Sequence, residues 1–468
     1  MRALAIDQGT TSTRALVVDE AGVTTVHSVE HRQFYPAPEH VEHDPEELIA
    51  NLTGCLQAAP DVDCVGLDNQ GESCLAWDAQ TGRAITPVIV WQDSRTAQIC
   101  ERLKAGGAEA LTLSKAGLPL DPYFSASKLG WIMTHVPQAR ELLRAGRLRL
   151  GTTDAFFRDR LTGSFATDPS TASRTSLLDL ETGTWDPELC ALFGVPMEAL
   201  PEIRPTSGIL GTLPGGRKLT ASVVDQQAAL YGHGARKQGD TKITFGTGAF
   251  ALTLTGTLAR GNGPLPTIAW SDQAGRNVHA LDGGVYAASS AINWARGLGL
   301  FSDFADIDEF DRPPAISRGI AFVPALAGLA CPHWDRNARG AWMGLSLDSK
   351  SIDMAQSVLE GVAFRTAEVM SSIAATTAIS EPVSIDGGMS RNPWFCQFLC
   401  DVLGRPLMIS DEPELTALGC AQLAAVGAGS SLERAPTGRL LTPRPVDPGW
   451  FETFVKARDA IRAFGANG

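Results

Sequence analysis

The sequence predicts an α/β protein built from two similar domains. Its 468 residues exceed what one hydrophobic core normally organises, so two or three domains are expected. One pattern also occurs in each half of the chain: an apolar strand, a turn rich in glycine and threonine, and a returning strand. Residues 3–18 carry the first copy and residues 241–255 the second. The repeat favours duplicated domains with a ligand-binding cleft between them, although two unrelated hairpins would look the same.

Hydrophobic periodicity and turn residues place the individual elements. In the first half we expect strands at residues 3–6, 14–18 and 23–29, helices at 44–58, 94–106 and 126–144, and a loop-rich section at 200–218. In the second half we expect strands at residues 241–245, 249–255, 320–324 and 383–385, and helices at 351–376 and 392–403. Small residues cluster at Gly232–Gly234. The predicted domains are therefore residues 1–234 and 235–468.

Composition and charge exclude several classes of function. The formal net charge is −13, which argues against binding to nucleic acid or to anionic membranes, because both present phosphates to a basic surface. No run of 18 apolar residues predicts a membrane-spanning helix. The nine cysteines have no zinc-binding spacing, and free buried thiols are typical of the reducing cytoplasm. A cytoplasmic protein is expected.

The first motif that could carry chemistry is the turn Asp7-Gln8-Gly9-Thr10-Thr11-Ser12, followed by Arg14. Glycine lets the backbone approach a ligand, and the N–H groups and hydroxyls of Thr10, Thr11 and Ser12 could hold phosphate oxygens. An aspartate at the end of a strand, beside those phosphates, is a position for Mg²⁺ and its waters. A plain hairpin with a solvated aspartate is the alternative.

Two further turns are rich in glycine. Gly246-Thr247 follows a strand and suits phosphate oxygens, while Gly387-Gly388, with Asn392 nearby, would let a flat ring such as adenine approach the backbone. Alone, the first is explained equally well as an ordinary hairpin turn, and a Gly-Gly pair like the second is more often just a turn.

Asp225 ends an apolar strand and begins a helical segment. One interpretation is a general base that accepts the proton of a substrate hydroxyl. A helix N-cap would account for the same residue without any catalytic function.

Taken in order, these four motifs resemble the FGGY family of carbohydrate kinases. Two longer segments also fit the family, residues 123–135 and residues 340–360. Within the family the chain is most similar to the glycerol kinases, through strings along nearly its whole length: Asp7 to Thr11, Val41 to Pro45, Val90 to Gln92, Asp121 to Ser125, Ala172 to Thr175, Asp225 to Leu230, and Glu414 with Thr416 to Gly419.

The resemblance implies two ribonuclease H-like domains of the actin/hexokinase type with an active site in the interdomain cleft. It also implies ATP and Mg²⁺ as cofactors, a small polyol as substrate and a homodimer as one assembly. The reaction expected is phosphorylation of a primary hydroxyl, from glycerol to glycerol 3-phosphate. The resemblance assigns the polyol to Glu72, Trp91, Tyr123, Asp225, Gln226 and Phe250, the nucleotide to Thr10, Thr11, Ser12, Arg14, Gly246, Thr247, Gly388 and Asn392, and the metal to Asp7 and Asp225, with Asp225 as the base.

The sequence departs from the family pattern at Gly71, where glycerol kinases have an arginine. The loss removes donors for substrate hydroxyls and opens space. Either glycerol binds more weakly, or the substrate is a longer polyol or a sugar. Asp93, which also departs from the family, could offer a new carboxylate. Residues 210–221 are shorter than the loop that binds fructose 1,6-bisphosphate in many bacterial members, which implies that this regulation is absent.

Two other classes of protein remain as alternatives on the same fold. One is a non-catalytic nucleotide-binding sensor, and the other is an ATPase of the actin or chaperone type. Retention of Asp7 and Asp225 counts against the first, and the polyol-binding residues Glu72, Trp91 and Tyr123 count against the second.

Overall fold

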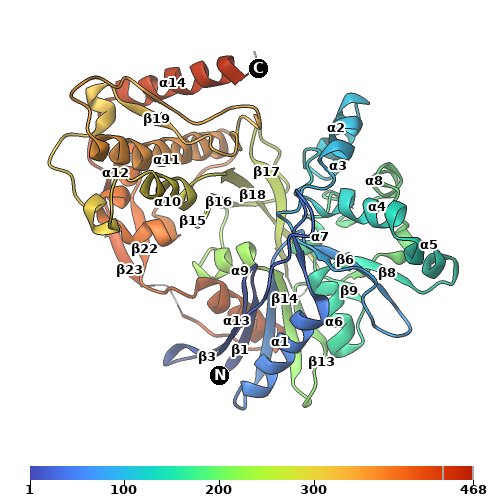
Figure 1. Cartoon of the computed structure of the whole chain (residues 1–468). Helices are drawn as coiled ribbons and strands as arrows, with labels where there is room; N and C mark the ends of the chain where they lie inside the picture. Colours follow the sequence, from blue (N-terminus) through green and yellow to red (C-terminus); the bar gives the residue numbers. More distant parts are fainter. Residues whose placement is uncertain (273, 435–436, 466–468) are drawn as a thin grey trace. The chain divides into compact units, whose positions relative to one another are not determined.

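A computed structural model describes residues 1–272, 274–434 and 437–465. Contacts divide the chain into two compact units (Figure 1). Unit 1 consists of Met1–Gly234, Thr267–His279 and Glu414–Ala435. Unit 2 consists of Ala235–Pro266, Ala280–Pro413 and Pro436–Gly468. Each unit therefore takes its residues from segments that are far apart in the sequence.

Unit 1 is organised around a six-stranded sheet with the order β13-β14-β5-β1-β2-β3. Its strands are β1 (Ala3–Gln8), β2 (Ser12–Asp19), β3 (Gly22–Glu30), β5 (Cys64–Asn69), β13 (Ser207–Thr212) and β14 (Lys218–Val224). Strands β1, β5 and β14 run parallel to one another, whereas β2, β3 and β13 pair antiparallel with their neighbours. The carboxyl ends of the three parallel strands consequently meet at one edge of the sheet.

Both faces of this sheet are covered by helices. Successive side chains of a strand point to opposite faces, so Leu4 and Ile6 contact one layer while Ala3 and Ala5 contact the other. The first layer is α1 (Pro45–Ala58) with α6 (Thr153–Thr162), and the second is α9 (Asp225–Gly232) with α13 (Leu415–Gly427). Because both faces are buried, β1 is a continuous apolar run rather than an alternating one.

A second, four-stranded sheet in unit 1 has the order β4-β7-β6-β8 and packs against α4 and α5. These elements are β4 (Glu42–His43), β6 (Cys74–Asp78), β7 (Val88–Ile89), β8 (Leu148–Thr152), α4 (Ser125–His135) and α5 (Pro137–Arg144). The single helix expected over residues 126–144 is therefore wrong. Pro137 divides it, because proline lacks an N–H and forces the preceding residue, Val136, out of the helical conformation.

Shorter elements complete unit 1: α2 (Ala97–Ala105), α3 (Glu109–Lys115), α7 (Pro169–Ala172), α8 (Pro187–Phe193), β9 (Ala166–Thr167), β10 (Leu178–Asp179), β11 (Thr184–Trp185) and β12 (Glu202–Ile203). The section at 200–218 is not only loop, since it contains β12 and all of β13. The segment expected to be shortened forms a tight hairpin between β13 and β14, closed by a hydrogen bond from Leu213 N to Arg217 O of 2.8 Å.

Most of a seven-stranded sheet with the order β17-β18-β16-β15-β21-β22-β23 lies in unit 2. The strands are β15 (Thr241–Phe245), β16 (Ala249–Gly256), β17 (Leu265–Ser271), β18 (Asn277–Val285), β21 (Val383–Gly387), β22 (Leu407–Ser410) and β23 (Gly438–Leu441). Its helices are α10 (Ser289–Gly297), α11 (Ser351–Ala374), α12 (Pro393–Leu403) and α14 (Gly449–Gly465), and a small hairpin joins β19 (Ala321–Val323) to β20 (Ala341–Met343).

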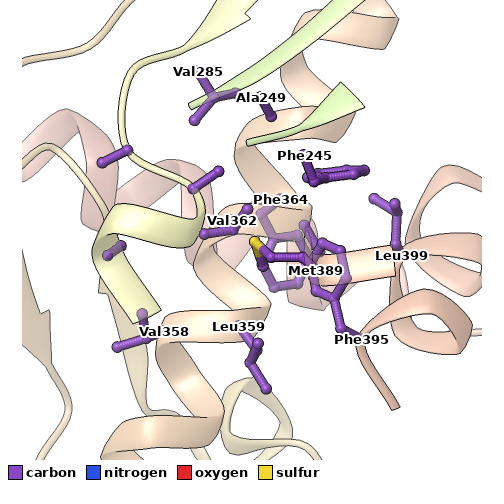
Figure 2. Close-up of a cluster of buried hydrophobic side chains, with 14 of the residues drawn as sticks. Phe245, Ala249, Val285, Val358, Leu359, Val362, Phe364, Met389, Phe395 and Leu399 are labelled. Carbon is purple, nitrogen blue, oxygen red and sulfur yellow. The ribbon is translucent and has the colours of Figure 1, made fainter. Parts of the chain in front are cut away.

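The core of unit 2 lies between this sheet and the helices α11 and α12 (Figure 2). Phe245 of β15 contacts Phe395 of α12 edge to face, with ring centroids 5.1 Å apart. Val358, Leu359 and Val362 form the buried face of α11, as its apolar period predicts. The core therefore supports the two turns that follow β15 and β21.

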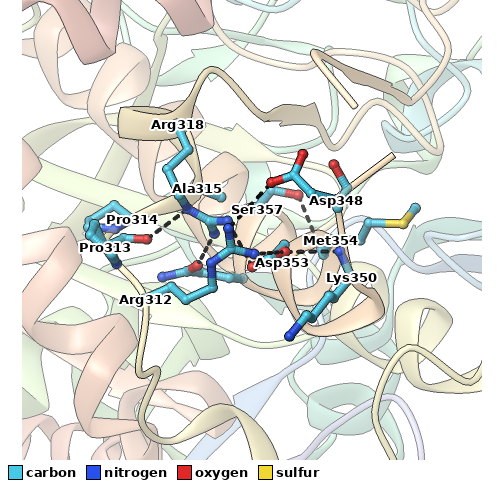
Figure 3. A network of polar contacts seen from close by, with 12 residues as sticks. Arg312, Pro313, Pro314, Ala315, Arg318, Asp348, Lys350, Asp353, Met354 and Ser357 are labelled. Atoms are coloured by element: carbon cyan, nitrogen blue, oxygen red, sulfur yellow. Dashed lines mark hydrogen bonds and ion pairs between the residues drawn. The ribbon is translucent and has the colours of Figure 1, made fainter. Parts of the chain in front are cut away.

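The long helix α11 is anchored at its start by a polar network (Figure 3). Asp353 accepts a hydrogen bond from Lys350 N (2.9 Å) and forms ion pairs with Arg312 (2.6 Å) and Arg318 (2.9 Å). Two turns further along the helix, Glu360 accepts hydrogen bonds from the backbone N–H groups of residues 315 and 316. Asp353 and Glu360, both in the segment 340–360, thus have a structural role: they join the first half of α11 to residues 312–318.

Among the described residues, no helix is both long and apolar enough to cross a membrane. All nine cysteines lie in the described part of the chain, and each is buried and free of any disulfide.

Candidate active site

The edge of the unit 1 sheet where parallel strands end collects three aspartates. Asp7 lies opposite Asp68 in the pairing of β1 with β5, and Asp225 directly follows β14 on the other side of β5. In open α/β sheets, ligands bind at the carboxyl ends of the parallel strands. The fold therefore brings Asp7 and Asp225 to one edge, although they are 218 positions apart in the sequence. It adds Asp68, which sequence reasoning did not single out.

Asp68 is fully buried beside this pair. Burial raises the pKa of Asp68 well above its ordinary value, and the nearby carboxylates of Asp7 and Asp225 act in the same direction. Three carboxyl groups therefore meet at this edge, and the raised pKa favours the protonated form of Asp68.

The turn after β1 is held in a defined shape. Gly9 N donates to Ser12 O at 3.0 Å and closes the turn. His31 supports it from β3's end, because its backbone N donates to Thr11 O (3.1 Å) and its Nε2 contacts Thr10 O at 2.9 Å. The contacts with His31 therefore fix the backbone of Thr10 and Thr11.

Arg14 and Asp7 are joined in an ion pair within unit 1. The Arg14 guanidinium contacts Asp7 Oδ2 at 2.5 Å and Glu414 at 2.8 Å. The arginine fixes the orientation of the Asp7 carboxylate. Contact of Arg14 with nucleotide stays a prediction.

Three of the residues assigned to the polyol, Glu72, Trp91 and Tyr123, lie close together in unit 1. Trp91 and Tyr123 meet edge to face with ring centroids 5.6 Å apart. The ammonium group of Lys128, a fully buried residue, donates to both of their backbone carbonyls, to Trp91 O at 3.3 Å and to Tyr123 O at 3.1 Å. The Trp91 indole also donates to Thr10 Oγ1 at 3.0 Å. One tryptophan thus contacts both the polyol group of residues and the phosphate turn.

Glu72 completes this group and has an unusual backbone. Its φ of 61° is in the left-handed region, which costs a residue with a side chain on the order of 1–3 kcal/mol. Ser125 Oγ donates to Glu72 O at 2.9 Å, and Arg174 Nε donates to Glu72 Oε1 at 2.7 Å. A Cβ added to Gly71 would lie 3.3 Å from Val224 Cγ1, so a side chain at this position would press on that valine.

Asp93 is not available to a substrate, and the expectation that it offers a new carboxylate is wrong. Both of its oxygens are occupied by the Arg95 guanidinium, at 2.9 and 2.7 Å, and Val41 N donates to one of them at 2.7 Å. The Asp93 side chain is buried with these partners.

Asp225 is the first residue of α9, and Gln226 follows it. Gln226 N donates to Asp225 Oδ1 at 2.7 Å. Val224 N, just before the aspartate, donates to Ser170 Oγ at 3.1 Å, which fixes the end of β14. The N-terminus of a helix favours a charged carboxylate, the form that a general base needs.

The remaining predicted residues lie in unit 2. The turn at Gly246-Thr247 is braced by the start of α10, since Ser289 N donates to Gly246 O (3.1 Å) and Ala288 N to Thr247 O (2.9 Å). Phe250 is half-buried on β16, directly after that turn.

Gly387 and Gly388 differ in the space around them. Gly387 has a φ of 92°, and a Cβ there would lie 2.3 Å from Phe245 O. A Cβ on Gly388 would meet nothing nearer than 3.8 Å, so this backbone is open to a flat ring. The side chain of Asn392 caps α12 through Phe395 N (2.7 Å) and donates to Ile307 O (2.8 Å). It shapes the loop, and its contact with adenosine stays a prediction.

No group of three or more His, Cys, Asp or Glu side chains within the described ranges has the geometry to enclose a metal ion by itself. Mg²⁺ usually takes one or two carboxylates and completes its shell with water and substrate phosphates. The oxygen donors of Asp7 and Asp225 fit that requirement.

Comparisons with known proteins agree with this geometry. The sequence profile of the FGGY family of carbohydrate kinases matches in two parts, its N-terminal domain over residues 2–223 and its C-terminal domain over residues 241–428. The chain belongs to the FGGY family of carbohydrate kinases. It is 40% identical over 446 residues to a glycerol kinase of Alkalilimnicola ehrlichii (91% of this chain, 90% of that protein). It is 42% identical over 447 residues to a glycerol kinase of Thermus brockianus, with the same coverage.

Solved structures give the same result for the fold. The crystal structure of Plasmodium falciparum glycerol kinase with ADP matches with a TM-score of 0.90 at 28% identity, covering 99% of this chain and 98% of that one. A gluconate kinase from Lactobacillus acidophilus matches with a TM-score of 0.89 at 22% identity, which supports the fold alone. The predictions of the family, of the two-domain α/β fold and of an ATP-dependent kinase with a small-molecule substrate are confirmed.

Sequence reasoning missed several residues of this FGGY site. Asp68 ends an apolar strand just as Asp7 does, and that signal could have identified it. Arg174 and Lys128 lie inside segments that were matched to the family, but nothing local to either indicates a partner far along the chain.

Proposed function

We propose that this FGGY kinase transfers the γ-phosphoryl group of ATP to a primary hydroxyl of glycerol, giving glycerol 3-phosphate. The observation that carries the proposal is the shared sheet edge in unit 1, where Asp225 begins α9 and Asp7 ends β1. Glu72, Trp91 and Tyr123 provide a carboxylate and aromatic faces suited to a small polyol in the same unit. The relatives named glycerol kinase, 40% and 42% identical over 91% of the chain, support glycerol.

In the proposed reaction, Asp225 accepts the proton of the attacking hydroxyl. The hydroxyl oxygen forms a bond to the γ-phosphorus, the bond from that phosphorus to the bridging oxygen breaks, and ADP leaves. A positioned base of this kind contributes about 10²- to 10⁴-fold in rate. Gln226, Glu72 and the Tyr123 hydroxyl bind the polyol hydroxyls, and the rings of Trp91 and Phe250 pack on its C–H groups.

The nucleotide is assigned to the two glycine–threonine turns and to the turn after β21. The turn at Thr10, Thr11 and Ser12, with Arg14, and the turn at Gly246-Thr247 donate N–H groups to phosphate oxygens. Gly388 and Asn392 lie at the adenosine. Mg²⁺, held by Asp7 and Asp225, would neutralise charge on the β- and γ-phosphates when bound.

A second candidate substrate is a longer polyol or a sugar, such as a tetritol, a pentitol or a ketose. The observation that favours it is Gly71, which supplies no side chain beside Glu72. The relatives named glycerol kinase favour the smaller polyol, and glycerol remains the proposed substrate.

The test is a coupled ADP-release assay with Mg-ATP and the purified full-length chain. Glycerol, erythritol, the pentitols, dihydroxyacetone and a set of ketoses are compared by kcat/KM. The proposal requires the highest value for glycerol. If a longer polyol or a ketose has a higher kcat/KM, that compound and not glycerol is the substrate. If no polyol or sugar stimulates ADP release, the enzyme is not a kinase of polyols or sugars.

The same proposal places the enzyme in the cytoplasm, as a monomer or homodimer without nucleic-acid or membrane partners. The nine free, buried cysteines and the net charge of −13 support it.

A further inference from the structure

The carboxylate of Glu72 raises a physical question. The Glu72 residue is only 4% exposed, and a buried carboxylate is costly unless a cation and hydrogen bonds compensate it. The preceding residue, Gly71, has no side chain that could do so. The charge that stabilises Glu72 has to come from elsewhere in unit 1.

It comes from Arg174, a residue 102 positions further along the chain. Arg174 Nε donates to Glu72 Oε1 at 2.7 Å, and the two side chains are each only 6% exposed. The arginine follows α7 in a closed turn, where Arg174 N donates to Thr171 O at 3.0 Å. The next residue, Thr175, accepts a hydrogen bond from Ala126 N at 2.8 Å. The backbone that carries the guanidinium is therefore tied on both sides.

The same guanidinium also contacts the aromatic residues beside Glu72. Arg174 Cζ lies 6.0 Å from the centre of the Tyr123 ring and 5.4 Å from that of Phe124. A guanidinium at this distance from an aromatic face is held there electrostatically, and the attraction strengthens when water is excluded. One cation thus joins two residues assigned to the polyol, Glu72 and Tyr123, which come from different elements.

We propose that Arg174 is the positioning residue that sets polyol affinity in this enzyme. It holds the Glu72 carboxylate in a fixed direction and lies against the ring of Tyr123, so that both residues meet the substrate without reorganising. Arg174 thus supplies to Glu72 the guanidinium that Gly71 does not supply. The inference rests on the proposed function, because Glu72 and Tyr123 are assigned to the polyol there.

A purely structural ion pair would behave differently. Its loss would lower stability and affect the kinetics with ATP and with glycerol alike. A positioning residue affects the glycerol KM alone, since it acts on the residues that contact the polyol and not on the phosphate turns.

The experiment measures kcat, the KM values of glycerol and ATP, and ADP release without polyol, for the full-length enzyme and for Arg174→Met and Arg174→Lys. Arg174→Met should raise the glycerol KM by about 10- to 100-fold, the range of one charge-assisted hydrogen bond, with the ATP KM within about twofold of wild type. Arg174→Lys should recover part of the loss, because it keeps the charge but not the planar fork. If Arg174→Met does not fold, the same comparison is made with Arg174→Lys.

Arg158→Met is the matched control. Arg158 is a second fully buried arginine of unit 1, on α6, and none of its guanidinium nitrogens has a hydrogen-bond partner among the described residues. Its replacement should leave the glycerol KM unchanged whatever it does to stability.

A double-mutant cycle with Glu72→Gln decides whether Arg174 acts through Glu72. In the Glu72→Gln background, Arg174→Met should change the glycerol KM by less than about threefold. Three results would overturn the inference and leave the kinase assignment intact. They are fully additive effects of the two substitutions, an unchanged glycerol KM in the single variants, and parallel increases in the KM of ATP and of glycerol. A wild-type enzyme that releases ADP without any response to polyols would instead reject the proposed function, and this inference with it.

Discussion

Replacing Gly419 with alanine should damage both stability and catalysis, because two helices of unit 1 touch through glycine at this point. A Cβ added to Gly419 of α13 would lie 1.9 Å from Ala228 O and 2.6 Å from Gly232 N of α9. A carbon normally stays about 3.5 Å from such atoms, so the helices would have to separate by roughly 1.5 Å. Overpacking of this kind costs about 1–3 kcal/mol of unfolding free energy, and occasionally more.

The same displacement would reach the proposed base. Asp225 is the first residue of α9, so a shift of that helix moves its carboxylate relative to the edge of the sheet. A misplacement of about 1 Å can reduce catalysis by about 10²-fold. Gly419→Ala should therefore lower both the free energy of unfolding and the kcat for glycerol.

Urea unfolding and the coupled ADP-release assay measure these two effects. Gly297→Ala is the control, since Gly297 ends α10 of unit 2 and an added Cβ there would meet nothing within 4 Å. The control should be neutral or slightly stabilised, by up to about 1 kcal/mol. A Gly419→Ala enzyme with wild-type stability and wild-type kcat would show that the helix contact is not as close as described and would refute the reasoning.

Three further predictions concern the site. Asp225→Asn should lower kcat by at least about 10²-fold while ATP binding, measured by calorimetry, stays near wild type; a near-normal kcat would remove Asp225 as the base. Gly71→Arg should raise the glycerol kcat/KM by about tenfold if the pocket is built for glycerol, after Val224 yields by a few tenths of an ångström, whereas a loss would indicate a pocket built for another substrate. Burial and the nearby His31 lower the pKa of His43 to about 3, so the unfolded chain binds the proton first as the pH falls below about 6.5. The contribution of neutral His43 to the free energy of unfolding is therefore complete above pH 6.5 and is lost toward pH 3. Between pH 7 and pH 5, thermal or urea unfolding should show that the free energy of unfolding falls by about 2 kcal/mol in the wild type, and that this decrease is absent in His43→Asn.

Elements with a strong local signal were predictable. The strand expected at residues 3–6 is β1, and the long apolar period at 351–376 is α11. The predicted elements were wrong where single residues, and not the hydrophobic period, decide the local structure. Pro137 divides the expected helix at 126–144, and β13 was missed within the section at 200–218 because turn residues conceal an edge strand.

The site could be predicted to the level of motifs but not of contacts. Asp7 and Asp225 each follow an apolar strand, a signal that is visible locally. The Trp91–Thr10 hydrogen bond has no such signal, since neither residue's neighbours indicate the other. The division of the chain into domains 1–234 and 235–468 and the roles of individual site residues stay predictions.

The sequence by itself determined the family and the chemical groups on hand: aspartates that end apolar strands, two glycine–threonine turns, and a glycine at position 71. These features are local, because a strand end or a turn imposes its residue types through backbone geometry. The tertiary structure decided which groups meet. Asp68 lies beside Asp7 only because β1 and β5 pair in one register, and Glu72 acquires its cation only because the turn after α7 folds against it. Register and packing are set by contacts between distant segments, and no local pattern encodes them.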